Sequence, residues 1–174
     1  MSDFDDALSR PDRLERAALV TTRLLVVLWV GALWAIGAIA VPTVFALVED
    51  RVLAGNVAGQ MFYLVGWLGV VCGLGLLLLA FGRGRRGAWR QPVVWLLLGM
   101  LMLVLAGHFG IAPHMADLKV QALPLAVMDS PHAAAFRFWH RISTALYAVL
   151  GMLGVVLAVQ YDVCGPLTRR RSRL

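Results

Sequence analysis

The stretch LLVVLWVGALWAIGAIAVPTVFALV, residues 24–48, carries no charged side chain and decides the fold class. A helix needs about 20 residues to cross the hydrocarbon core of a bilayer, so this stretch is long enough to span a membrane. Three further apolar stretches follow at residues 57–81, 93–111 and 142–161. The sequence therefore predicts an all-α, polytopic membrane protein built as a four-transmembrane-helix bundle.

The composition favours the same environment. Hydrophobic residues make up 60% of the chain and charged residues only 15%, whereas a soluble domain carries about 25% charged residues. The basic balance of +6 does not indicate nucleic-acid binding, because the basic residues flank the apolar stretches instead of covering a separate domain. The partner that these residues predict is the lipid bilayer.

The basic residues also predict the orientation. Twelve of the 16 precede the first stretch, follow the fourth, or lie between the second and third; the other four are Arg51, Lys119, Arg137 and Arg141. Cytoplasmic segments carry the excess of arginine and lysine, so both termini are expected in the cytoplasm of a multi-pass protein of the bacterial inner membrane. The expected parts are a cytoplasmic lead-in helix (1–23), the four-helix transmembrane domain (24–162) and a basic cytoplasmic tail (163–174).

Small residues predict where the helices approach closely. At 100° per residue, five glycines of the second span share one face, and close backbone approach is what drives helix packing in lipid. These glycines are Gly55, Gly59, Gly66, Gly69 and Gly73. Gly31 lies on the proposed partner face of the first span. Pro42 is expected to kink the first span, and Pro113 to end the third.

The fourth span carries a polar face made of His140, Ser143, Thr144 and Tyr147. Polar groups in a membrane turn toward protein or water rather than lipid. This face therefore predicts either a small cavity that opens to the outer side or hydrogen bonds between helices. The Ser130-Pro131 pair is typical of a helix start, so this helix is expected to begin near Pro131, before the apolar stretch.

Histidine is the only abundant metal-ligand type, and all four histidines lie in the outer half of the protein or beyond it. Imidazole with thioether suits copper, which makes His114, Met115 and His140 candidate metal ligands. Imidazole alone suits haem iron, for which His108 and His140 are candidate axial ligands. The spacing matches no metal-binding signature. Structural histidines and core-filling methionines remain the alternative, and neither copper nor haem is assigned.

Short motifs in both halves of the chain resemble a known family. Residues 28–31 (LWVG), 41–45 (VPTVF) and 54–62 (AGNVAGQMF), followed by 111–115 (IAPHM) and 136–143 (FRFWHRIS), resemble a bacterial domain-of-unknown-function membrane family related to animal transmembrane protein 205. This family is similar in architecture to copper-resistance D proteins and HemJ-type protoporphyrinogen oxidases. The resemblance spans residues 24–160. It makes metal or haem handling more plausible and transfers no established activity.

Three functions fit the sequence. The first is a protein that handles a small solute or metal ion, binding it in an outer-facing polar cavity for transport or a related task. The second is a haem-binding redox protein, and the third is a non-catalytic assembly partner of another membrane protein. The first is preferred, although a four-helix chain leaves little room for transport without a homodimer. No catalytic residue is assigned, and a role without catalysis is favoured.

Overall fold

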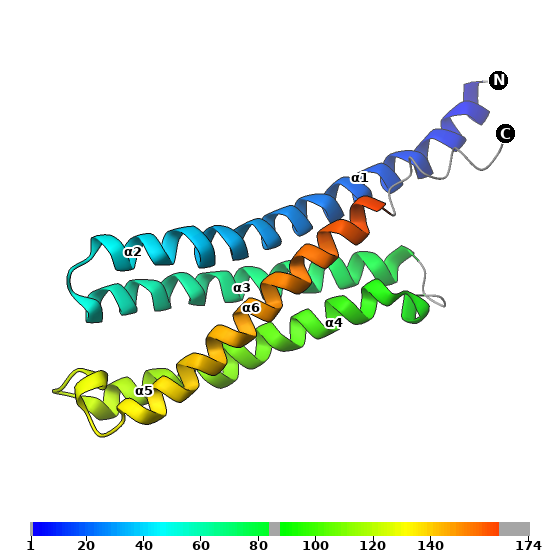
Figure 1. Ribbon diagram of the computed structural model, residues 1–174. Helices are drawn as coiled ribbons and strands as arrows, with labels where there is room; N and C mark the ends of the chain where they lie inside the picture. The colour runs from blue at the N-terminus through cyan, green and yellow to red at the C-terminus, as the bar shows by residue number, and fades with distance from the viewer. Residues whose placement is uncertain (1, 84–87, 164–174) are drawn as a thin grey trace.

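The computed structural model describes residues 2–83 and 88–163, and the regular elements within these ranges are all helical (Figure 1). Four helical segments are long and apolar enough to cross a membrane: Arg13–Leu47, Arg51–Gly82, Pro92–Ala122 and Ala133–Gln160. The prediction of an all-α bundle with four membrane-spanning helices is confirmed. The third and fourth segments are longer than their apolar stretches, because the third continues beyond residue 111 and the fourth begins before residue 142.

Two of the four spans are composite. The first consists of α1 (Ser2–Trp34), the π-helical turn η1 (Ala35–Ala40) and α2 (Val41–Leu47), and the third of α4 (Pro92–Leu105), the π-helical turn η3 (Ala106–Ile111) and α5 (Ala112–Ala122). The second and fourth spans are the unbroken helices α3 (Arg51–Arg83) and α6 (Ala133–Val163). Two short 3-10 turns, η2 (Ala88–Arg90) and η4 (Val127–Asp129), lie in the connections that precede α4 and α6.

The helices pack around a core in the half of the bundle that lies nearer the chain termini. In this half α1 contacts both α3 and α6, and α4 also contacts both of them. The largest fully buried side chains come from all four spans and are Trp29, Leu33, Leu76, Leu97, Met100 and Leu157. At this end the bundle is therefore closed by tightly packed apolar side chains.

The two π-helical turns stand in equivalent places, each just before a proline. The N–H of Val41 donates to the carbonyl of Ile36, five residues back, and the N–H of Ala112 likewise donates to Gly107. Pro42 and Pro113 each follow one residue later. A proline has no N–H to donate, and its ring clashes with the carbonyl four residues back. A π turn widens the helix at that point, so the chain continues as a helix instead of ending.

Charged side chains close the short connection between α2 and α3. The Asp50 carboxylate accepts the N–H groups of Val52 and Leu53 at 2.8 and 3.2 Å, which caps the start of α3. The Arg51 guanidinium donates to the carbonyl of Phe45 at 3.1 Å. These charges are thus engaged with backbone groups at the end of α2 and the start of α3.

The structure bears on three boundary predictions and contradicts one of them. Pro113 does not end the third span, since α5 carries the helix on to Ala122. The lead-in segment is continuous with the first span, because α1 runs without a break from Ser2 to Trp34. Helix α6 begins at Ala133, with the Ser130 hydroxyl accepting the N–H of His132 at 3.2 Å. Residues 164–174, most of the predicted basic tail, lie outside the described residues.

Candidate functional site

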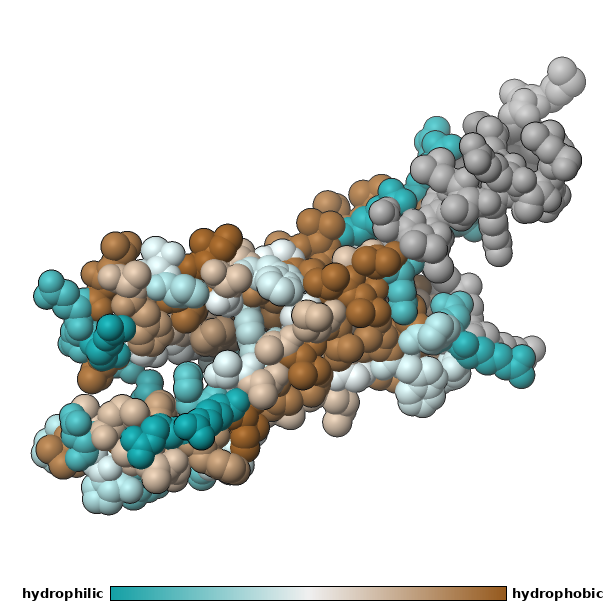
Figure 2. All heavy atoms as spheres, viewed as in Figure 1, coloured by the Kyte–Doolittle hydropathy of each residue, from teal (hydrophilic) through white to brown (hydrophobic). Residues whose placement is uncertain are grey.

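A cleft separates two arms of the bundle at the end that bears α2 and α5. We call this the outer end, following the predicted orientation. One arm consists of α2 and the first turns of α3, and the other of α5 and the first turns of α6 (Figure 1). The space-filling view shows a hollow between the arms with hydrophilic residues along it (Figure 2). The four helices therefore diverge toward the outer end, where the closed core gives way to this outer cleft.

The glycine face of α3 shows where the bundle opens. An added Cβ on Gly69 would meet the Val104 side chain at 3.2 Å, and one on Gly73 would meet Leu101 at 3.2 Å. An added Cβ on Gly66 would collide with the His108 ring. These three glycines of the predicted stripe thus pack within the chain, against the third span and against Trp29 of α1.

The outer part of the same glycine face has no close neighbour. Cβ atoms built on Gly55 and Gly59 have nothing within 4 Å, although both residues share the face that packs at Gly66. Gly31, the predicted partner on α1, also has nothing within 4 Å. Close packing was expected at all three positions, and the structure does not place it there. Gly55 and Gly59 belong to the first turns of α3, within one of the two arms that border the outer cleft.

Tyr147 on α6 contacts two other helices of the bundle. Its ring meets the Phe62 ring edge-on, with centroids 4.8 Å apart. Its hydroxyl donates to the carbonyl of Leu33 at 2.6 Å. An added Cβ on Gly37 would collide with the Tyr147 ring, so this glycine lets the ring lie against η1. The Tyr147 hydroxyl is thus a donor from α6 to the first span, two residues before η1 begins.

Lys119 joins the two arms. Its Nζ donates to Oδ1 of Asn56 on α3 at 3.0 Å, and it lies 5.9 Å from the centroid of the Phe136 ring on α6. Both partners are neutral. The outer cleft therefore holds an ammonium group whose contacts are a side-chain amide and an aromatic ring.

The other predicted cavity residues do not have contacts to other helices of the kind that Tyr147 has. His140 is exposed, and its ring lies parallel to that of Phe136 at 6.2 Å between centroids. The Thr144 hydroxyl donates to the carbonyl of His140 at 2.9 Å, so it is used within its own helix. Ser143 is half-buried. Of the four predicted cavity residues, Tyr147 has the contacts that reach other helices.

The candidate metal ligands have separate surroundings. His114 packs edge-on against Trp139 at 4.9 Å, whereas His140 stacks on Phe136. Met115 is half-buried on α5. Within residues 2–83 and 88–163, no group of three or more histidine, cysteine or acidic side chains lies close enough to hold a metal ion.

The two histidines proposed as haem ligands lie at different depths. His108 packs against Gly66, four residues further along α3 than Phe62, which adds about 6 Å toward the closed end. His140 precedes Tyr147, the neighbour of Phe62, by seven residues, or about 10 Å toward the outer end. The imidazoles are therefore about 15 Å apart along the bundle. Imidazole nitrogens bind a metal at about 2 Å, so this arrangement does not provide a pair of axial ligands.

Sequence reasoning missed the residues that define the outer cleft. Lys119 and Asn56 are not among the predicted site residues, whereas Phe62 and Phe136 are candidates only through the motifs of the family resemblance, residues 54–62 and 136–143. Lys119 offered a signal, because it is the only lysine in the chain. Because the sequence predicts that the third span ends near Pro113, it also predicts that Lys119 lies in the connection after that span.

Comparison with known proteins places the chain in a family. A family model described as a domain of unknown function, DUF4149, matches residues 24–124. No curated protein and no solved structure matches the chain significantly. The match covers the first three spans, a narrower range than the resemblance noted above, and it gives no support to a relation with transmembrane protein 205, copper-resistance D or HemJ proteins. Because the match covers more than half of the sequence, the chain belongs to the DUF4149 family.

Proposed function

We propose that this membrane protein handles a small anionic solute, which it binds in the outer cleft. The single observation that carries the proposal is the position of Lys119, a cation between the two arms with neutral partners on both sides. Ionisable residues within membrane-spanning helices are costly and usually mark binding sites or solute pathways.

The chemistry around Lys119 supports an anion more than a metal ion. An anion entering the cleft gains a charge-assisted hydrogen bond from the ammonium group, stronger than the bond that Lys119 makes with neutral Asn56. A metal ion would instead be repelled by the ammonium group. The described residues also bring no three histidine, cysteine or acidic groups together.

The shape of the cleft supports a small ligand. Gly55 and Gly59 have open space beside them, and the rings of Phe62 and Tyr147 pair further along α3 and α6. Ligand sites commonly combine apolar and aromatic walls with a few polar groups that fix orientation. Beyond this pair the bundle is closed by buried side chains such as Trp29 and Leu33. A ligand would therefore enter from the outer side, and solute transport or sensing would follow from its binding.

A thermal-shift screen tests this proposal. The purified protein is heated with small monocarboxylates, dicarboxylates and phosphate esters, each beside a neutral analogue of the same size. We expect at least one anion, but not its neutral analogue, to raise the melting temperature, because binding to the folded state stabilises it. Lys119→Gln should weaken binding of that anion about 10- to 100-fold, the loss expected for a hydrogen bond between charged groups.

Arg51→Gln is the control for this screen. It removes another exposed cation at the outer end, one that donates to the Phe45 carbonyl and not across the cleft. This variant should bind the anion as well as the unaltered protein does. Equal binding of neutral analogues, or full binding by Lys119→Gln, would refute an anion site at Lys119.

A further inference from the structure

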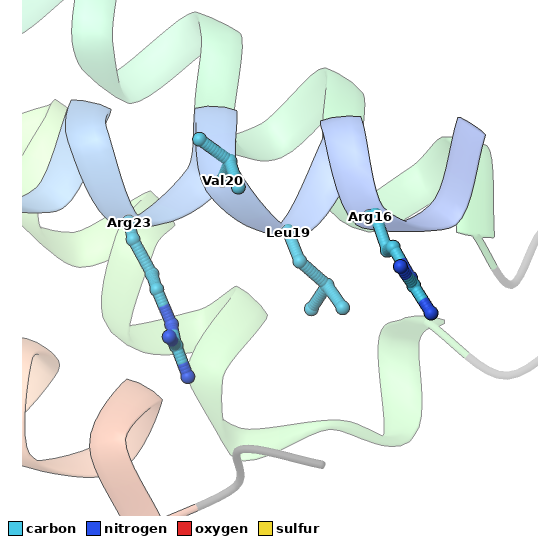
Figure 3. Close-up of a pocket in the computed structure, with 4 residues that line it drawn as sticks. All are labelled: Arg16, Leu19, Val20 and Arg23. Atoms are coloured by element: carbon cyan, nitrogen blue, oxygen red, sulfur yellow. The ribbon is translucent and has the colours of Figure 1, made fainter. Parts of the chain in front are cut away.

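A second site lies at the opposite end of the bundle, on the first turns of the first span. A groove of about 250 Å³ is lined by Arg16, Leu19, Val20 and Arg23, all from α1. These residues follow the spacing i, i+3, i+4 and i+7, which places them on one face of the helix. In the close-up, the side chains of Arg16, Leu19 and Arg23 leave α1 on the same side (Figure 3). We call this the α1 groove.

The α1 groove combines two positive ends with an apolar floor. Arg16 and Arg23 are exposed and lie two helical turns apart, about 10 Å along the axis. Leu19 and Val20 lie between them, and Val20 is 56% exposed. Among the side chains that the structure describes, from residue 13 onward on this helix, neither arginine has an ion-pair partner. The groove is therefore a surface of net positive charge with hydrocarbon at its centre.

The depth of the groove matches that of a lipid headgroup. The first membrane-spanning segment extends from Arg13 to Leu47, and its charge-free run begins at Leu24, directly after Arg23. The groove thus lies where the apolar part of the helix meets the polar surface of the bilayer. Guanidinium groups bind phosphate through paired hydrogen bonds, and apolar side chains beside them pack against an acyl chain.

We propose that the α1 groove binds an anionic phospholipid of the surrounding bilayer. The two arginines would hold its phosphate and headgroup, and Leu19 with Val20 would contact the start of an acyl chain. This site is independent of the outer cleft, from which the length of the bundle separates it.

Lipid retention measures this binding directly. The protein is reconstituted in nanodiscs of mixed phosphatidylglycerol and phosphatidylcholine, extracted in mild detergent and analysed by native mass spectrometry. We expect the unaltered protein to retain phosphatidylglycerol in preference to phosphatidylcholine. Arg16→Gln with Arg23→Gln should lower that preference about 25-fold, since each basic residue near a membrane surface contributes about fivefold.

A matched pair of leucine variants separates the groove from overall charge. Leu19→Glu puts a carboxylate on the groove floor, whereas Leu14→Glu puts the same charge on nearly the opposite face of α1. Leu14 is 75% exposed, so its substitution removes no packing. We expect Leu19→Glu to lose the retained phosphatidylglycerol and Leu14→Glu to keep it.

Three outcomes would overturn the proposal. The first is retention of phosphatidylglycerol by the double arginine variant at the level of the unaltered protein. The second is equal loss by both leucine variants, which would indicate general electrostatic attraction. The third is equal competition by soluble glycerol phosphate, which would indicate a site for free phosphate. Circular dichroism of each variant checks that the helices are intact.

Discussion

Gly66→Leu is expected to destabilise the bundle by about 3 kcal/mol, the upper part of the range for overpacked cores. The reason is the contact between α3 and η3, where even a Cβ atom at this position would collide with the His108 ring. The His108 ring has little room to move, because Tyr63, Trp67 and Phe109 surround it at centroid distances of 4.9, 5.1 and 4.8 Å. A leucine at residue 66 therefore forces α3 and the third span apart. Unfolding by SDS, followed by circular dichroism, measures the loss.

Gly59→Leu provides the comparison on the same helix face. An added Cβ at this position has nothing within 4 Å, so the leucine side chain has space in the outer cleft. Its free energy of unfolding should stay within about 0.5 kcal/mol of the unaltered protein, as for most exposed substitutions. Equal destabilisation by both variants would mean that the glycine face packs along its whole length and that the arms are not separated.

Tyr147→Phe is the second change with a large expected effect. The variant keeps the ring contact with Phe62 but removes the hydroxyl that donates to the Leu33 carbonyl. Unpaired buried polar groups cost about 1–3 kcal/mol each, although hydrogen bonds between membrane helices average nearer 0.6 kcal/mol. We expect a loss of about 1–2 kcal/mol. Faster hydrogen exchange of the η1 amides should accompany it, because the hydrogen bond that joins α6 to this part of the first span is lost.

Tyr63→Phe is the matched control for this change. Tyr63 is 47% exposed and contacts His108 through its ring, so loss of its hydroxyl should leave stability and exchange unchanged. If Tyr147→Phe left both the stability and the exchange of the η1 amides unaltered, the Tyr147 hydroxyl would have no role in holding η1.

The number and positions of the spans could be predicted because they depend on local composition. A charge-free run of 25 residues such as 24–48 has few alternatives to a membrane helix. The inner glycines could be predicted for a similar reason, since Gly66, Gly69 and Gly73 repeat at helical spacing. The two π-helical turns could not be predicted from the sequence. The prolines signalled a disturbance, but the side chain that donates to the backbone beside η1 belongs to Tyr147, 114 residues from its acceptor Leu33.

The outer cleft was only partly predictable. Helical periodicity places Tyr147 on the polar face of α6, but it does not show where two arms diverge. The pairing of Lys119 with Asn56 joins residues 63 positions apart and depends on the continuation of the third span beyond Pro113. A proline that ends a helix and one that follows a π turn have the same local sequence, so the location of Lys119 required the fold.

The most direct test of the account is whether water reaches the outer cleft from outside the cell. Gly59→Cys and Gly99→Cys are compared in a chain whose own cysteines are replaced by alanine, in intact cells treated with a charged, membrane-impermeant methanethiosulfonate reagent. Both glycines are exposed and have open space around them, but Gly59 lies in the arm that borders the cleft and Gly99 lies on α4, away from it.

The reagent reacts with thiolates, which form in water and not in hydrocarbon. We predict rapid labelling at residue 59 and none at residue 99. No labelling at residue 59, equal labelling at both positions, or labelling at residue 59 only in inverted membranes would contradict an outward-facing cleft.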